Sequence, residues 1–195
     1  ENDNYPQFLN RSYSTSVSED IPWSHHPIIA SVTATDADED LNAVIKYSII
    51  GGNTQGHFQM NSLTGEISVI APLNYESTRN YRLTIRAQDA GSPPRSNTTR
   101  MLINVEDVND NDPKFYNSLF QETVIENTPI GHSILRVQAY DDDDAQNAAI
   151  TYSIKNYEKL NIPLAINNET GWITTTKELD WEEANLYEFT VIAKD

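Results

Sequence analysis

The sequence of 195 residues contains no cysteine and few basic residues. Without cysteine the chain can form no disulfide, no thiolate nucleophile and no cysteine-based zinc or iron–sulfur site. Only 13 Lys and Arg stand against 29 Asp and Glu, which gives a formal net charge of −16. A charge of this sign repels nucleic acid and anionic lipid and attracts cations, so we expect no nucleic acid partner.

Long apolar runs are also missing, because no stretch reaches the roughly 18 residues that a membrane-spanning helix requires. The polar start at residues 1–4 does not resemble a signal peptide. We therefore expect any membrane anchor in a segment outside this chain. With 38% hydrophobic residues, 7 glycines and 9 prolines, the chain can still build a folded core and is neither disordered nor collagen-like.

The chain contains two tandem copies of one sequence pattern. The motif Asn-Asp-Asn-x-Pro-x-Phe occupies residues 2–8 and recurs at residues 109–115. Matching residues follow in the same order through both copies: Glu19 with Glu126, Tyr47 with Tyr152, and Asp89 with Asp195. A repeat of this length predicts two similar domains in series.

Apolar residues alternate with polar ones inside each copy, as at Tyr81, Leu83 and Ile85. This period of two is typical of strands with one buried face. About seven short strands per copy, with almost no helix signal, predict an antiparallel β-sandwich. In the first copy we expect strands at residues 11–17, 27–34, 43–50, 57–60, 66–70, 80–88 and 98–106.

The second copy stops at Asp195, where its sixth strand is expected to end. The seventh strand is missing from this sequence, so one strand edge should keep unpaired backbone groups. Such an edge favours fraying or association with another chain.

Acidic residues gather where strands end. Because consecutive strands run in opposite directions, successive loops lie at alternate ends of a sandwich, which we name the leading and the trailing end. The loop at residues 36–38 falls at the leading end of the first copy, and residues 107–111 fall at its trailing end. The leading end of the second copy follows directly, so we expect seven carboxylates at one junction: Glu19, Glu76, Asp107, Asp110, Asp141, Asp143 and Asp195.

Such a cluster requires bound cations. Two like charges ~4 Å apart repel by about 1 to 4 kcal/mol at water-like to surface-like dielectric. A ligand set of oxygens without His or Cys selects a hard cation, and many flexible carboxylates suit Ca²⁺ better than Mg²⁺. An EF-hand is excluded at residues 36–47, because its sixth position is Leu41 and its twelfth is Tyr47. A solvated surface loop is the better explanation of any single Asp-x-Asp, but it does not explain acidic residues that recur in register.

An enzyme is not expected. Paired carboxylates can hydrolyse glycosides, but here they are duplicated in both copies and lie at domain ends rather than in one cleft. The usual hydrolase and nucleotide motifs are also missing from the sequence. Three Asn-x-Ser/Thr sequons predict glycosylation, which suits an extracellular protein: Asn10, Asn97 and Asn168.

Two motifs now carry a family resemblance. Residues 107–113 resemble the cadherin linker Asp-x-Asn-Asp-Asn-x-Pro, and residues 179–182 resemble the cadherin Leu-Asp-Arg-Glu. The resemblance implies two tandem immunoglobulin-like Greek-key β-sandwiches on the cell surface, in the extracellular part of a plasma-membrane protein, with about three Ca²⁺ ions at their junction. It also implies these parts: the end of a preceding linker at 1–4, a cadherin repeat at 5–107, a calcium-binding linker at 108–112, and a repeat at 113–195 without its last strand.

The resemblance also implies the calcium ligands. Site one would use Glu19, Asn74, Glu76 and Asp110. Site two would use Glu19, Glu76, Asp107, the Val108 carbonyl, Asp110 and Asp143. Site three would use Asn109, the Asn111 carbonyl, Asp141, Asp143, the Asn147 carbonyl and Asp195. Since Asn74 stands where the family has Asp, we expect site one to bind calcium most weakly.

Two further half-sites are implied at the outer ends of the copies. The leading one comprises Asn2, Asp3, Asn4, Asp36, Asp38, Asn42 and Asp89. The trailing one comprises Glu126, Asp180 and Glu182.

Within the cadherins, residues 147–150 and 170–174 resemble the seven-pass Flamingo group. This resemblance implies calcium-dependent homophilic adhesion in planar cell polarity, with other cadherin ectodomains, above all the same protein on an opposing cell, as partners. The alternative is a passive calcium-stiffened spacer in a Fat-like or protocadherin-like receptor array.

Overall fold

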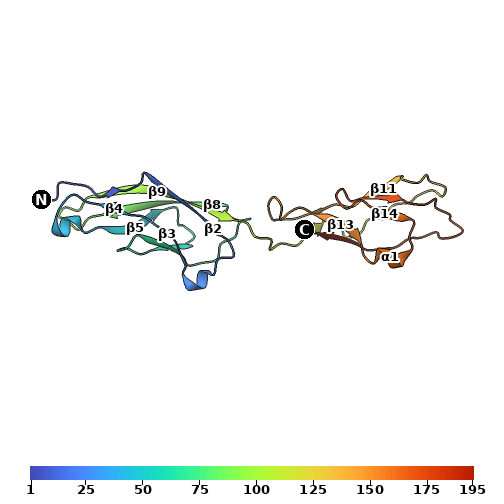
Figure 1. Ribbon diagram of the computed structural model, residues 1–195, viewed down its shortest axis with the longest axis horizontal. Helices are drawn as coiled ribbons and strands as arrows, with labels where there is room; N and C mark the ends of the chain where they lie inside the picture. The colour runs from blue at the N-terminus through green and yellow to red at the C-terminus, as the bar shows by residue number, and fades with distance from the viewer. The chain divides into compact units, whose positions relative to one another are not determined.

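The structure is a computed structural model that describes residues 1–195, and its chain forms two compact units. Unit 1 comprises Glu1–Val108 and unit 2 comprises Asn109–Asp195 (Figure 1). Both consist of short strands, and helical turns are few and brief. The predicted all-β fold is thus confirmed. None of the helical segments has the length and apolar composition of a membrane-spanning helix.

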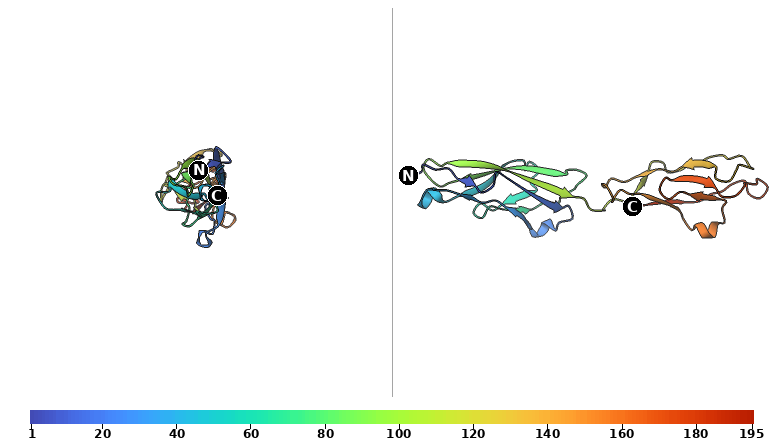
Figure 2. Two further views of the ribbon diagram at one scale, coloured as in Figure 1. Left: turned by 90° about the vertical axis from the view of Figure 1, so that its left-hand side faces the viewer. Right: turned by 45° about the horizontal axis from the view of Figure 1, so that its top comes forward.

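Unit 1 packs two sheets over one core. The larger sheet has the order β2-β9-β8-β5, formed by Ser12–Ser18, Ser96–Glu106, Asn80–Gln88 and Lys46–Gly51. The smaller has the order β3-β7-β6, formed by Ile28–Ser31, Glu66–Val69 and Phe58–Met60. A short ladder joins β1 (Gln7–Phe8) to β4 (Ala34–Thr35). Figure 2 shows the two layers of this unit.

Alternation along the strands builds the core of unit 1. Leu83 and Ile85 of β8 and Met101 and Ile103 of β9 are buried, whereas their neighbours in each strand face outward. Ile67 of β7 closes the core from the smaller sheet. The period of two in the sequence is therefore the signature of a sheet with one dry face.

One ladder departs from the predicted antiparallel pattern. β2 pairs with β9 in parallel, from Ser12 opposite Arg100 to Ser18 opposite Glu106. The reason is parity: six reversals of direction separate the first strand of the sandwich from the seventh, so both run the same way. The consequence is that residues after β2 and residues after β9 lie at the same end of unit 1.

Three predicted strands differ from the observed ones by more than one residue. The strand expected at 27–34 is split into β3 and β4, with a bulge between Ile28 and Ala30. The strand expected at 43–50 begins at Lys46, because a 3₁₀ turn, η2 (Asp40–Ala43), precedes it. The last strand begins at Ser96 rather than at 98. A second 3₁₀ turn, η1 (Trp23–His25), lies between β2 and β3.

Unit 2 has the same strand pairings as unit 1 except for those of β2 and β9. Its three sheets are β10-β12 (Lys114–Phe115, Ala139–Tyr140), β11-β15-β14 (Ser133–Arg136, Trp172–Thr175, Leu164–Ile166) and β13-β16 (Thr151–Ile154, Val191–Lys194). One helical turn, α1 (Tyr157–Leu160), follows β13. Residues 117–126, the counterpart of β2, form no strand. Since β2 is paired with β9 in unit 1, and unit 2 contains no counterpart of β9, this segment has no ladder to join.

Candidate metal centre

The leading end of unit 2 gathers three carboxylates. Asp141 and Asp143 follow β12, and Asp195 follows β16. One carboxylate oxygen from each lies within 4.8 Å of the others. The Asp143 side chain is buried, and the Oδ2 atom of Asp141 is buried without a hydrogen-bond partner. Three carboxylates at this spacing repel one another, so the arrangement offers oxygens to a hard cation.

Amide groups hold these carboxylates in place. The Asn111 backbone amide donates to Asp143 Oδ2 at 3.3 Å, and the Asn111 side-chain amide donates to Oδ1 of the same residue. The Asp143 backbone amide donates to Asp141 Oδ1 at 3.0 Å. Neutral donors therefore orient the carboxylates but leave their negative charge uncompensated.

The leading end of unit 1 has the same construction. Asn4 donates from its backbone to Asp38 Oδ2 at 3.2 Å and from its side chain to Oδ1 at 2.6 Å. The side-chain hydrogen bond from Asn4 lowers the pKa of Asp38, because it favours the charged form. The Asp38 backbone amide donates to Asp36 Oδ1 at 3.0 Å. Asp89 takes the place that Asp195 has in unit 2, is 4% exposed, and accepts a 3.5 Å contact from Asn2 Nδ2.

The trailing end of unit 1 depends on the parallel ladder. Because Ser18 lies opposite Glu106, Glu19 and Asp107 emerge at the same end. Glu19 is 7% exposed and accepts backbone hydrogen bonds from Tyr75 at 2.7 Å and Val108 at 2.8 Å, one at each oxygen. Carboxylate oxygens of Glu76 lie within 4.8 Å of one of Glu19 and one of Asp107. The first unit thus assembles three of the predicted ligands by itself.

Asn74 begins the turn that positions Glu76. Its Oδ1 atom accepts the Ser77 amide at 2.7 Å, and its carbonyl accepts the Thr78 amide at 3.0 Å. In unit 2 Asp180 caps the matching turn, with its Oδ1 atom accepting the Glu182 amide at 2.9 Å. Asn74 therefore keeps the turn geometry and supplies no charge.

The trailing end of unit 2 brings three of the predicted ligands together. Glu126, Asp180 and Glu182 place carboxylate oxygens within 4.8 Å of one another. The Trp181 amide donates to Glu126 Oε2 at 3.2 Å, as the Tyr75 amide does to Glu19.

The other predicted ligands lie in loops or turns of their own units. Asp3 and Asp110 each accept the side-chain amide of the following asparagine, at 3.0 and 2.9 Å. Asn42 lies in η2, and the Asn147 amide donates to the Asp144 carbonyl. Val108 ends unit 1 and Asn109 begins unit 2. The joining of both units in one three-ion junction stays a prediction.

The three sequons at Asn10, Asn97 and Asn168 are exposed.

Two residues that anchor the acidic loops escaped the sequence analysis. The Ala34 amide donates to the Tyr47 hydroxyl at 2.9 Å, and the Ala139 amide donates to the Tyr152 hydroxyl at 3.0 Å. Both bonds fix the strand from which an Asp-x-Asp loop emerges. The match of Tyr47 with Tyr152 in the repeat is the signal that could have revealed this role.

A cation stands beside the cluster of unit 2. Lys114 forms an ion pair with Asp142 at 2.6 Å, with about half of each side chain exposed. The hydrogen bond that Lys114 donates to Asp142 raises the pKa of Lys114, since it stabilises the ammonium form. This pair engages the one residue of the 141–143 loop that is not a predicted ligand.

Comparison with known proteins gives one consistent answer. The family model described as Cadherin domain matches residues 13–106 and 120–195. The whole chain is 55% identical to the protocadherin-like wing polarity protein stan of Drosophila melanogaster and 47% identical to the human cadherin EGF LAG seven-pass G-type receptor 3. It spans only 5% and 6% of the length of these relatives. The resemblance to the seven-pass Flamingo group is thereby confirmed.

Solved structures agree with the family match. A mouse cadherin-23 fragment, EC22-24, has a TM-score of 0.86 and 36% identity over 98% of this chain and 59% of that one. Mouse clustered PcdhgC3 EC1-3 has a TM-score of 0.88 and 29% identity, with 100% of this chain and 64% of that one covered. The matched proteins are adhesion receptors and not enzymes.

Removal of the Tyr152 hydroxyl should loosen the acidic loop of unit 2. In Tyr152→Phe the Ala139 amide loses its partner, so the free energy of unfolding of unit 2 should fall by about 1 to 3 kcal/mol. Urea unfolding measures the loss. Tyr116→Phe, at a side chain that is 64% exposed, is the matched control and should change stability by less than about 0.5 kcal/mol. Equal effects of both variants would contradict the anchoring role.

Proposed function

Since the chain belongs to the cadherin family, we propose that it forms two calcium-stiffened extracellular repeats of a cell-surface adhesion receptor. The observation that carries the proposal is the cluster of Asp141, Asp143 and Asp195, oriented by amides and without a neutralising cation among them. Its construction recurs at the leading end of unit 1 around Asp38. Loops that were merely solvated would not be expected to repeat an arrangement in which carboxylates repel one another.

About three Ca²⁺ ions would occupy the junction. In the proposal, Glu19, Glu76 and Asp107 of unit 1 share these ions with Asp110, Asp143 and the other ligands of unit 2. Modules outside the cell bind calcium near ~10⁻⁴ to 10⁻³ M. Millimolar Ca²⁺ at a ~0.1 mM site stabilises the bound state by roughly 1.4 kcal/mol, so coupled sites suffice to order a linker.

The mechanism is conformational. Without calcium the carboxylates repel, and the linker at 108–112 samples many angles. With calcium the ions bridge both repeats and fix one angle. An array with fixed angles meets an opposing cell with less loss of orientational entropy, so adhesion becomes calcium-dependent.

The relatives support a role in polarity. One of them is named a wing polarity protein, and the chain matches it over its full length. We extend this to homophilic adhesion between cadherin ectodomains on opposing cells, with the membrane anchor outside this chain and glycans at the three exposed sequons. The junction would belong to the extracellular side, where calcium is abundant.

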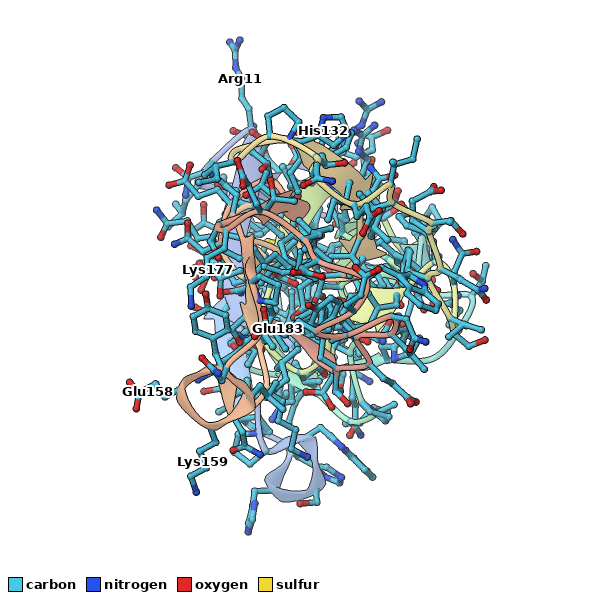
Figure 3. The ribbon with its side chains drawn as sticks, turned by 90° about the vertical axis from the view of Figure 1, so that its right-hand side faces the viewer. Arg11, His132, Glu158, Lys159, Lys177 and Glu183 are labelled. Carbon is cyan, nitrogen blue, oxygen red and sulfur yellow. The ribbon has the colours of Figure 1, made fainter.

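Small-angle scattering in millimolar Ca²⁺ and with chelator tests the mechanism. We expect a narrow set of conformations with calcium and a broad ensemble without it. Asp143→Asn should broaden the calcium form, because this residue serves two sites, whereas Glu158→Gln, with the same charge change on an exposed residue that projects from α1 (Figure 3), should not. Identical profiles with and without calcium would overturn the proposal.

Asn74→Asp should strengthen site one. The turn should survive, because Asp180 caps the matching turn of unit 2, and the added carboxylate restores the missing charge. We expect the weakest calcium affinity to rise by about tenfold, since one extra charged ligand contributes on the order of 1 to 2 kcal/mol. Isothermal titration calorimetry measures this, with Asn80→Asp, at an exposed position of β8, as the control. A rise in both variants would indicate only a general charge effect.

The passive spacer is the second candidate, because long arrays contain repeats that set reach without touching a partner. A bead-aggregation assay separates the two. If these repeats form the adhesive contact, beads coated with the chain should aggregate in calcium and disperse with chelator. Dispersed beads, together with calcium-dependent scattering, would favour the spacer.

A further inference from the structure

The outer face of the larger sheet of unit 1 carries a group of cations in an otherwise acidic chain. In β9 the odd-numbered residues from Thr99 to Val105 are buried, so Arg100 faces outward. In β8 the buried residues are also odd-numbered, so Arg82 and Arg86 share that outer face. Lys46 of β5 joins them, because it alternates with buried Tyr47. We name these four residues the basic face.

The strand register brings the four together. Arg86 lies opposite Ser48 on one side and Thr98 on the other, so Lys46 and Arg100 are its diagonal neighbours. Arg100 lies opposite Thr84, which makes Arg82 its next diagonal neighbour. Diagonal positions in a sheet are ~7 to 8 Å apart at Cα. Lys46, Arg86, Arg100 and Arg82 therefore form one continuous line of positive charge across three strands.

No carboxylate neutralises this line. The acidic residue among the outward positions, Glu106, lies at the trailing end of β9. Most of the other outward positions carry small hydroxyl residues: Ser12, Ser14, Ser48, Thr84, Ser96 and Thr98. None of the four cations forms an ion pair or a side-chain hydrogen bond. The Nε atom of Arg86 is buried and has no partner.

The acidic residues of unit 1 are segregated along its length. Apart from Glu66, the acidic residues lie at the two ends: Glu1, Asp3, Asp36, Asp38, Glu39, Asp40 and Asp89 at the leading end, and Glu19, Asp20, Glu76, Glu106 and Asp107 at the trailing end. The net charge of −16 describes the whole chain and does not reveal the cations gathered on this sheet.

The composition of the face selects its ligand. Arginine binds sulfate or carboxylate oxygens with two parallel hydrogen bonds, and small hydroxyls add donors without obstructing a flat ligand. Aromatic side chains, the usual anchors of protein partners, do not lie among the outward positions of β9 and β8. We propose that the basic face binds a sulfated polysaccharide of the cell surface, with its sulfate groups along the line of cations.

Glycosylation would leave this face open. Asn97 precedes Thr98 in β9, so its side chain points to the opposite side of the strand, and a glycan there would leave the line of cations uncovered. The inference shares with the proposed function only the extracellular setting, because none of the four cations is a predicted calcium ligand.

Binding to immobilised heparin, measured by surface plasmon resonance with the full chain in millimolar Ca²⁺, tests the proposal. The chain should bind heparin at physiological salt, lose affinity steeply as salt rises, and not bind chemically desulfated heparin. The double variant Arg82→Ser/Arg100→Ser should lose affinity by about tenfold or more. The control Lys159→Ser/Lys177→Ser removes the same charge from exposed positions of unit 2 (Figure 3) and should stay within about twofold.

Three outcomes would overturn the proposal: no binding by the unchanged chain, an equal loss in the control, or equal binding to the desulfated polymer. If heparin does not bind and sedimentation shows a salt-sensitive dimer that Arg82→Ser/Arg100→Ser abolishes, the basic face is instead a surface for self-association. Scattering of the same variant separates the two proposals, because its response to calcium should match that of the unchanged chain. If the unchanged chain binds heparin but its scattering does not respond to calcium, only the calcium mechanism is contradicted.

Discussion

Hydrogen bonds from neutral amides hold the carboxylates of this protein together against their mutual repulsion. Glu19 accepts one backbone amide at each oxygen, and Asp143 is held by the backbone and the side chain of Asn111. Such bonds orient a carboxylate and favour its charged form, but they add no positive charge. The repulsion between the carboxylates therefore remains, and bound divalent cations are the simplest means of neutralising it. In the proposed mechanism the fold therefore positions the ligands, and bound ions would supply the remaining stabilisation.

The same constraint explains the distribution of charge in unit 1. Carboxylates that must meet at the ends of a sandwich have to lie in loops and at strand ends, where the parity of the strands collects them. The sheet faces between the ends are then free of that requirement, and in unit 1 they carry Lys46, Arg82, Arg86 and Arg100 instead. Calcium at the ends and a polyanion along the side would thus act on separate parts of one repeat, each neutralising the charge that the other leaves.

Most of the fold and much of the site follow from the sequence. Alternation predicted β8 at its observed bounds, and the reversal of consecutive strands predicted that Glu19 and Asp107 lie at the same end of unit 1. Other features depend on contacts that a local pattern does not encode. The hydroxyl bonds of Tyr47 and Tyr152 are tertiary, and the basic face exists only through register between strands distant in sequence. Residues 117–126 of unit 2 carry an apolar pattern similar to that of β2 but form no strand. We attribute the difference to the absence of a strand equivalent to β9, with which β2 pairs in unit 1.

That missing ladder bears on site three. In unit 1 the strand before Asp89, β8, is paired on both sides, with β5 and with β9. In unit 2 the strand before Asp195, β16, is paired with β13 alone. A groove of about 760 Å³, lined by Leu164, Ile173 and other core residues, lies open in unit 2, whereas Met101, Ile103 and Val105 of β9 are buried in the core of unit 1. A carboxylate that follows a strand paired on one side only is more mobile than one that follows a strand paired on both sides. It therefore loses more conformational entropy when an ion fixes it. Calcium should therefore bind site three more weakly in this chain than in one where a seventh strand completes the sheet, and the difference measures how far the β-sandwich itself preorganises its metal ligands.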